Sequence, residues 1–299
     1  MDYLALAEKP KPSTESLTLL ETRLNDAYKK YSKNFLNAQL LKSLASVKAY
    51  YLGKPDEAII LLTEFLEQPG IEAGLKAEFK IMLADIHLVS ADIWEASLLY
   101  SQVEKDFKYE PIGKEAKFRN AKLSFYAGDF EWAKTQADVL KGGTTQLISN
   151  DAIDLSLIIS DAIGVDTNDV PLRMFASAEL MILQHRYSEA IIRMDSINQL
   201  FSSNTLGDDI YFKKAAIYEK LGQYAETEAM YKNILEYYPS DLYGDDAQFR
   251  LAELYENKLN DKDKARAAYQ EVLLKYPGSI FTVEARKRFR NLRGDNLNN

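Results

Sequence analysis

The sequence predicts an all-α fold, an α-solenoid of antiparallel helical hairpins stacked one on the next. One observation is an internal repeat, because Tyr231 recurs 38 residues later as Tyr269 and Pro239 recurs 38 residues later as Pro277. A second is composition, because 13 Gly and 8 Pro are too few for the many turns of an all-β fold. A lone hairpin cannot bury its own apolar face, so repeated hairpins must stack.

The expected helices follow from apolar residues at helical spacing and from the turn residues between them. Ser13 or Thr14 begins the first helix, and Gly53 and Pro55 mark the turn within the first hairpin. The predicted hairpins occupy residues 36–67, 74–107, 113–141, 170–202, 208–238 and 244–276, with single helices around 148–163 and 281–292.

The register of the hairpins breaks in the middle of the chain, which indicates three parts. Residues 13–141 form a sub-array with an N-terminal helix, and residues 142–169 form an inserted helix with loops. Residues 170–293 form a second sub-array with a C-terminal capping helix. If the middle part is a hinge, the two sub-arrays move against each other.

Composition and missing motifs argue against catalysis and against nucleic-acid binding. The net charge is −8 and the isoelectric point is about 5.1, whereas nucleic-acid binding needs a basic face. With no cysteine and only two histidines, a zinc site or a Ser-His or Cys-His nucleophile is not expected. Glycine-rich phosphate-binding motifs are absent. We therefore predict no enzyme, no metal and no cofactor.

The two clearest repeats resemble the tetratricopeptide repeat (TPR) family. Its pattern combines Leu-Ala, an aromatic residue three positions later, a Gly-x-Tyr turn, an early alanine in the second helix and a final proline. The fifth hairpin supplies Ala215, Tyr218, Leu221-Gly222-Gln223-Tyr224, Tyr231 and Pro239. The sixth supplies Leu251-Ala252, Tyr255, Ala265, Tyr269 and Pro277. The resemblance implies a right-handed superhelix whose concave groove binds an extended segment or a helix of another protein.

The other hairpins depart from this pattern. Thr227 stands where the fifth hairpin should have the alanine of its second helix. The first four hairpins keep mainly this alanine, as Ala58, Ala96, Ala133 and Ala190. Residues 142–169 show no match to the pattern.

Two segments narrow the resemblance to TPR proteins of the bacterial envelope. Residues 238–247 and 276–288 look like segments of BamD-like outer-membrane assembly lipoproteins and YbgF-like periplasmic proteins. Residues 116–163 look like the C-terminal part of larger exported TPR proteins, which implies a fragment whose signal peptide lies upstream. The implied location is the periplasm or the outer membrane, or the cytoplasm if Met1 is the native start. No window approaches the ~20 apolar residues of a membrane span, so none is predicted.

The candidate partner-binding groove begins with four phenylalanines at one position of successive first helices. They are Phe118, Phe175, Phe212 and Phe249, and the last three are spaced by 37 residues. One interpretation is a hydrophobic ladder that binds a partner. The other is that the rings pack between adjacent helices, as aromatic stripes at helical spacing usually do.

Acidic residues stand at the neighbouring groove positions: Glu179, Asp209, Glu219, Asp246, Glu253 and Glu256. An acidic groove would favour a basic or polar ligand. The alternative is an ordinary solvated helix face. The carboxylate-clamp form of TPR requires Lys and Asn at these positions, so chaperone C-terminal tails are poor candidate ligands.

A basic run, Arg286 to Arg293, lies near the C-terminus. It could bind anionic lipid or nucleic acid. The favoured interpretation is a capping helix that exposes these charges and covers the last repeat with Phe281, Val283, Phe289 and Leu292.

Taken together, these features predict a non-enzymatic scaffold or adaptor that binds other proteins in a bacterial envelope assembly or secretion complex. One alternative is a regulatory domain of a larger protein whose chemistry lies outside this chain. Another is a module for self-association through the groove.

Overall fold

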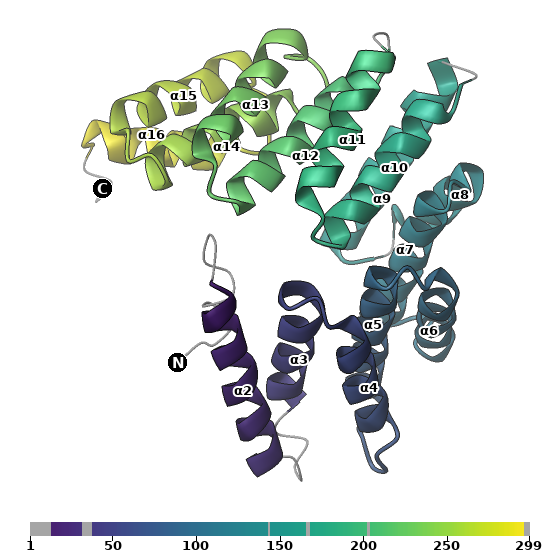
Figure 1. Cartoon of the computed structure of the whole chain (residues 1–299). Coiled ribbons are helices and arrows are strands. Elements are labelled where there is room, and N and C mark those ends of the chain that lie inside the picture. The colour runs from purple at the N-terminus through teal and green to yellow at the C-terminus, as the bar shows by residue number, and fades with distance from the viewer. Residues whose placement is uncertain (1–12, 32–37, 143, 166–167, 202–203, 296–299) are drawn as a thin grey trace. The chain divides into compact units, whose positions relative to one another are not determined.

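The computed structural model describes residues 13–31, 38–142, 144–165, 168–201 and 204–295, and the regular elements of these residues are helices (Figure 1). In chain order they are α2 (Thr14–Tyr31), α3 (Ala38–Ser46), the π-helical turn η2 (Val47–Tyr51), α4 (Pro55–Leu66), α5 (Ala73–Val89), α6 (Ile93–Asp106), α7 (Pro111–Tyr126), α8 (Phe130–Leu140), α9 (Gln146–Val165), α10 (Val170–Leu183), α11 (Tyr187–Leu200), α12 (Gly207–Lys220), α13 (Tyr224–Tyr237), α14 (Gly244–Asn257), α15 (Lys262–Lys275) and α16 (Thr282–Arg293).

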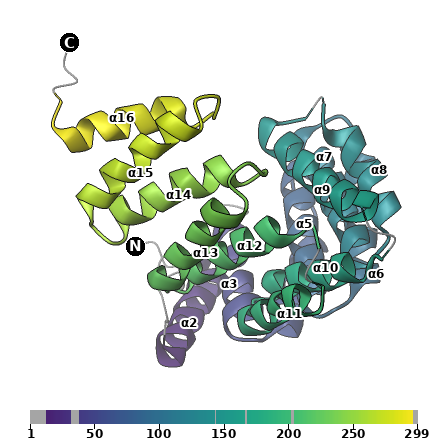
Figure 2. The ribbon, with the colours of Figure 1, turned by 90° about the horizontal axis from the view of Figure 1, so that it is seen from above.

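Helices that follow one another in the chain pack against one another, as a solenoid requires. The structure divides into two compact units at a point inside α11, with residues 1–193 in the first unit and 194–299 in the second. In the first unit α4, α5, α6, α7 and α8 pack in succession, and in the second so do α12, α13, α14, α15 and α16 (Figure 2). The predicted all-α array of hairpins is confirmed.

The turn inside every hairpin has the same backbone geometry. One residue of each turn has a positive φ, between 52° and 82°: Gly53, Ala91, Gly128, His185, Gly222 and Asn260. The amide that follows reaches back to a carbonyl five or six residues earlier, for example from Asp92 to His87 at 2.9 Å and from Gln223 to Tyr218 at 2.8 Å. This is a common way to end a helix, and it reuses carbonyls that the helix leaves unpaired.

The alanine of the second helix is buried in the hairpins of both units. Ala58, Ala96, Ala133, Ala190 and Ala265 are each 0% exposed. Thr227 takes this position in α13, is also 0% exposed, and satisfies its hydroxyl by donating to the carbonyl of Gln223 at 2.9 Å. Small side chains here allow neighbouring helices to approach closely. The predicted packing role of these positions is confirmed, and threonine is small enough to share it.

Helix α9 lies outside the hairpin pattern, as the sequence predicts, and packs against α7, α8 and α10 within the first unit. Its buried Ser156 donates a hydrogen bond to Asp138 of α8 at 2.7 Å. Ala152 and Ile159 are both 0% exposed, so α9 contributes to the core. The hinge predicted for residues 142–169 stays a prediction.

A helix covers each end of the described chain. Leu17, Leu20 and Leu24 of α2 form an apolar cluster with residues of α3 and η2. At the other end, Phe281, Phe289 and Leu292 of the predicted capping segment pack against the last repeat. That α16 acts as a cap stays a prediction.

One residue of that prediction is wrong. Val283 is 76% exposed. It stands two positions after Phe281, and residues two apart on a helix point in different directions. The apolar face of α16 is therefore narrower than the sequence pattern indicated.

Candidate functional site

In the second unit, the predicted phenylalanine ladder lies against aromatic neighbours from the same unit. Phe249 of α14 is 6% exposed and stacks on Phe281, with ring centroids 4.6 Å apart. Phe212 of α12 is half-buried and stacks on Tyr243 at 4.3 Å. Stacked rings at these distances fill the space between successive repeats.

In the first unit, the two ladder positions are also buried. Phe175 of α10 is 0% exposed and Phe118 of α7 is 9% exposed. A fully buried ring offers no surface to a partner unless the helices around it move. Phe118, Phe175 and Phe249 therefore lie in the core of the described structure, where replacing them would disturb packing before it disturbed a surface.

Two of the predicted acidic residues are held by the capping helix. The carboxylate of Glu256 accepts hydrogen bonds from Tyr269 at 2.7 Å and from Arg288 of α16 at 2.9 Å. Arg288 also lies 4.0 Å from the carboxylate of Glu253. Because one arginine faces both carboxylates, this part of the predicted acidic surface is largely neutralised within the unit.

The remaining acidic positions differ in exposure. Glu179 of α10 is 8% exposed and lies 3.9 Å from the ammonium of Lys122. Asp209 is 6% exposed, at the start of α12. Glu219 and Asp246 are half-buried. Helix starts favour acidic residues, which explains Asp209 and Asp246 without a ligand.

The structure adds a groove that the sequence did not predict. It is a cavity of about 230 Å³ in the first unit, between α3, α5 and α7, the first helices of three successive hairpins. Its lining residues are Lys42, Glu78, Ile81, Met82, Asp85, Ile112, Glu115 and Arg119. We call it the first-unit groove.

A fixed charge network forms the floor of the first-unit groove. Arg119 of α7 donates two hydrogen bonds from Nη1 to the carboxylate of Asp85, at 2.8 and 2.7 Å. Its Nε and Nη2 donate to Glu115 at 3.1 and 2.7 Å, and Tyr100 of α6 donates its hydroxyl to Asp85. Charge-assisted bonds of this kind hold side chains in one orientation. Helices α5, α6 and α7 are tied together by this network.

Burial controls the ionisation of this network. Burial raises the pKa of the Asp85 carboxyl, and the charge of Arg119 with the hydrogen bonds from Tyr100 and Arg119 opposes that rise. Burial, together with the nearby Asp85 carboxylate, also raises the pKa of the Tyr100 hydroxyl well above its usual value. At neutral pH Tyr100 is therefore a neutral donor.

The edge of the groove combines exposed charges with apolar side chains. Lys42 and Glu78 form an ion pair between α3 and α5, and half of the Glu78 side chain is exposed. Met82 and Ile112 contribute apolar surface between the charges. An arrangement of this kind suits binding of a side chain or chain segment.

The sequence did not indicate this groove because its residues come from hairpins without the TPR pattern. Asp85 and Arg119 are separated by 34 positions on different helices. The one local signal is the spacing of Glu115 and Arg119, four residues apart on one helix, which predicts an ion pair but not a groove.

Among the described residues, no group of three or more His, Asp or Glu side chains is arranged to hold a metal ion. None of the described helices combines the length and the apolar character needed to cross a bilayer.

Comparison with known proteins points to repeats in the second unit. Residues 209–241 and 246–279 match the family model described as tetratricopeptide repeat. No curated protein matches the chain. Similar solved structures include a tetratricopeptide repeat protein from Parabacteroides merdae, with 17% identity, 97% of this chain and 98% of that chain covered, and a TM-score of 0.36. The TPR domain of P58(IPK) has 17% identity, coverage of 97% and 72%, and a TM-score of 0.33.

The family match covers the helices α12 to α15, where the sequence pattern is clearest and where the alanine, tyrosine and proline positions repeat. Two consecutive segments of this chain are therefore similar to tetratricopeptide repeats.

Proposed function

We propose that this chain is a non-enzymatic scaffold that binds another protein, and that the first-unit groove is a contact site. The observation that carries the proposal is the groove itself, a cavity of about 230 Å³ between three successive first helices. Repeat arrays use surfaces of this kind to bind extended segments or helices of partners. The TPR match supports the same class of function, since TPR domains typically bind proteins.

The charges of the groove suggest the chemistry of the partner. Lys42 and Arg119 face Glu78, Asp85 and Glu115, which leaves one negative charge in excess. Lys42 compensates Glu78, and Arg119 is shared by Asp85 and Glu115, so the excess lies on the two carboxylates around Arg119, of which Glu115 is the more exposed. A segment with a basic residue beside an apolar one complements the carboxylates and the surface of Met82.

The predicted second-unit surface is a further candidate for partner contact. Glu219 and Asp246 are half-buried, so part of each side chain is accessible. We propose this surface as a second contact site for the same protein-binding function.

The cellular setting that we propose is a bacterial envelope complex. It rests on the resemblance of residues 238–247 and 276–288 to envelope TPR proteins. Fractionation of source cells with an antibody to this chain tests it. Recovery with the envelope supports the proposal, and recovery only in the cytosol contradicts it.

The binding proposal is tested by affinity capture with surface variants. Glu78→Lys combined with Glu115→Lys reverses the exposed charge of the groove. The matched control, Glu131→Lys combined with Glu226→Lys, reverses two exposed charges on second helices. Circular dichroism and urea unfolding first confirm that all three proteins are folded.

We expect one partner to be captured by the unchanged chain and by the control, and to be lost with the groove variant. Equal capture by all three would exclude the groove. Alanine at Phe212 and Phe249 is a poor probe of binding, because Phe249 is buried and its removal would damage the core.

The two alternative roles give different results. Sedimentation that shifts with concentration, and no longer does so in the groove variant, would indicate self-association through this site. A catalytic domain upstream in the full reading frame would indicate a regulatory domain.

A further inference from the structure

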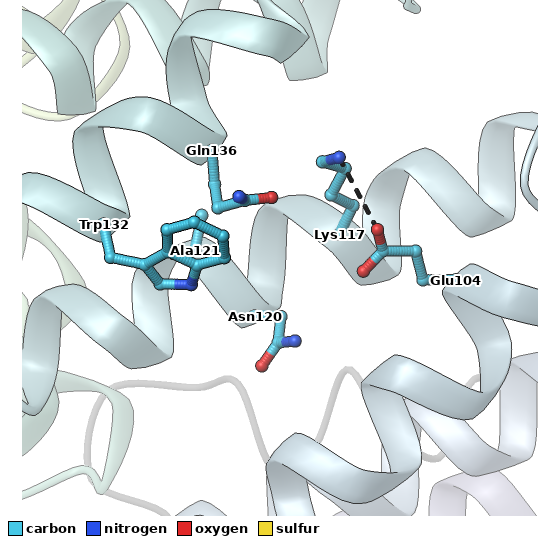
Figure 3. Close-up of a pocket in the computed structure, with 6 residues that line it drawn as sticks. All are labelled: Glu104, Lys117, Asn120, Ala121, Trp132 and Gln136. Carbon is cyan, nitrogen blue, oxygen red and sulfur yellow. Dashed lines mark ion pairs between the residues drawn. The ribbon is translucent and has the colours of Figure 1, made fainter.

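A second pocket lies in the first unit, between the second helices α6 and α8, with α7 as its floor. Its lining residues are Glu104, Lys117, Asn120, Ala121, Trp132 and Gln136 (Figure 3). The cavity has a volume of about 140 Å³ and opens to solvent. An apolar cavity of about 150 Å³ holds one benzene-sized ring. The pocket is therefore large enough for a single six-membered ring and too small for several residues of a peptide.

Trp132 supplies an aromatic wall. The side chain is 54% exposed, so part of the ring is accessible to a ligand. Among the described residues, no hydrogen bond to its indole N–H and no stacking partner is found. The indole therefore presents both a flat apolar face and a free donor at one position.

Two amides stand beside the ring. Asn120 of α7 accepts a hydrogen bond from Ser97 at 3.0 Å and donates one to Ser101 at 3.2 Å, which fixes its orientation. An amide can make four hydrogen bonds, so one N–H and one lone pair of Asn120 remain. Gln136 is half-buried, and within the described part of the chain its amide has no hydrogen-bond partner.

The charged groups of the pocket balance each other. Lys117 lies 3.6 Å from the carboxylate of Glu104, across the pocket from Trp132 (Figure 3). This is an ion pair without a short hydrogen bond, so both groups keep hydrogen-bonding capacity. With one charge of each sign, the pocket has no electrostatic preference for an anion or a cation.

The ligand that fits these features is neutral and small, and carries many groups that both donate and accept hydrogen bonds. A sugar ring combines these properties. Its C–H face is apolar and can cover the indole, while each hydroxyl can donate to one amide oxygen and accept from one N–H. A nucleobase would stack equally well but offers fewer such groups, and a phosphate would need an excess of positive charge.

We propose that the pocket formed by Trp132, Gln136, Asn120 and the Lys117–Glu104 pair binds one neutral hexose unit, such as the terminal residue of a glycan. The site lies on second helices and α7 and shares no lining residue with the first-unit groove. The sugar-binding proposal can therefore fail or hold independently of the protein-binding role proposed above.

The chain has two tryptophans, so a single substitution isolates the signal of the pocket. In Trp94→Phe, the remaining indole is Trp132, and Trp94 is itself 87% exposed, so the fold should persist. This variant is titrated with D-glucose, D-galactose, D-mannose and N-acetyl-D-glucosamine in the millimolar range, with tryptophan emission as the readout. N-acetylglycinamide and 9-methyladenine are the peptide and nucleobase probes.

We expect at least one hexose to change the emission in a saturable way. Gln136→Ala in the same background should weaken its binding about tenfold, as loss of ligand hydrogen bonds commonly does. The matched control Gln270→Ala, an exposed glutamine of α15, should leave it unchanged. Saturation-transfer NMR with Trp132→Ala, checked by circular dichroism, should show loss of the sugar signal.

Three results would overturn the proposal. One is the absence of saturation with all four sugars. Another is sugar binding that Gln136→Ala and Trp132→Ala leave unchanged. The third is saturation by N-acetylglycinamide or 9-methyladenine but by no sugar, which would assign the pocket to a peptide or a nucleobase.

Discussion

The two units contain the same three-residue network in different surroundings. In the first unit it joins Asp85 of α5, Tyr100 of α6 and Arg119 of α7. A carboxylate on a first helix accepts from a tyrosine on its own second helix and from an arginine on the next helix. Both Asp85 oxygens accept from Arg119, and the network forms the floor of a groove.

In the second unit the same network joins Glu256 of α14, Tyr269 of α15 and Arg288 of α16. Here the arginine belongs to the capping helix, and only one of its hydrogen bonds reaches Glu256. The network therefore attaches a cap instead of lining a groove. Each tyrosine follows the buried alanine of its helix by four positions, so the network belongs to the hairpin framework.

This comparison shows that a TPR-like framework can be kept while its surfaces change. The hairpins nearest the consensus fill their spaces with stacked aromatic rings, such as Phe249 on Phe281. The hairpins that depart from it enclose the two cavities described above. Residues that match the consensus therefore pack between helices, and the candidate binding sites lie in the hairpins that depart from it.

The largest expected effect comes from breaking the two networks. Asp85→Ala leaves Arg119 and Tyr100 without their shared partner in a largely buried site and should lower the free energy of unfolding by about 3 kcal/mol. Glu256→Ala should cost less, about 1–2 kcal/mol, because Arg288 donates one hydrogen bond to Glu256, whereas Arg119 donates two to Asp85. Urea unfolding measures both.

Asp106→Ala is the matched control, because this residue is 58% exposed and its ion pair to Lys80 is 4.0 Å long. It should cost less than about 1 kcal/mol. Equal losses for Asp85→Ala and Glu256→Ala would show that the two networks contribute alike and would contradict the comparison.

The next effect tests whether both units use the buried alanine alike. Ala96→Leu in the first unit and Ala265→Leu in the second each overpack a position that is 0% exposed. Both should lower the free energy of unfolding by about 1–3 kcal/mol. Ala267→Leu, at an exposed position of α15, should change it little. If Ala96→Leu left the free energy of unfolding unchanged, the degenerate hairpins would pack more loosely than those nearest the consensus.

A pH experiment tests how the first described helix, α2, is attached to the rest of the first unit. Burial raises the pKa of Glu21 in α2, but hydrogen bonds from Lys48 and Lys54 outweigh this and leave the pKa below its usual value of 4.5. A carboxyl with a lowered folded-state pKa stabilises the protein above its unfolded pKa, and this contribution is lost as pH falls further. We expect the free energy of unfolding to decrease as the pH is lowered below about 4.5.

Glu21→Gln should make that fall smaller, as measured by urea unfolding between pH 7 and pH 3. Glu15→Gln, on the exposed first turn of the same helix, is the control and should leave the profile unchanged. An unaltered profile in Glu21→Gln would show that α2 is attached by its leucines alone.

The smallest effect concerns the turns. Ala91 has a φ of 61°, where a side chain is strained, so Ala91→Gly should raise the free energy of unfolding by up to about 1 kcal/mol. Ala127, with a φ of −74°, is the control, and Ala127→Gly should lower it by about 0.5–1 kcal/mol. If Ala91→Gly lowered the free energy of unfolding, contacts of the Ala91 side chain would contribute more to stability than the strain of its backbone costs.

Much of the fold could be predicted from the sequence because its signals are local. Gly53 with Pro55 marks a turn, apolar spacing marks a helix, and the spacing of Tyr231 and Tyr269 marks a repeat. Val283 was misplaced because helix phase at a chain end depends on where the helix begins. The exposure of Phe175 could not be predicted, since the same spacing describes a ladder open to a partner and a ring enclosed by neighbours.

The sequence by itself determined the helices, their turns and the small residue that each second helix needs, because these depend on contacts within one hairpin. Only the tertiary structure decided which charges meet. Arg119 lies 34 positions from Asp85, and Trp132 lines one pocket with Lys117 and Glu104 only when three helices stack. Side chains from different hairpins form these sites, and the distance between them is set by the packing of whole helices.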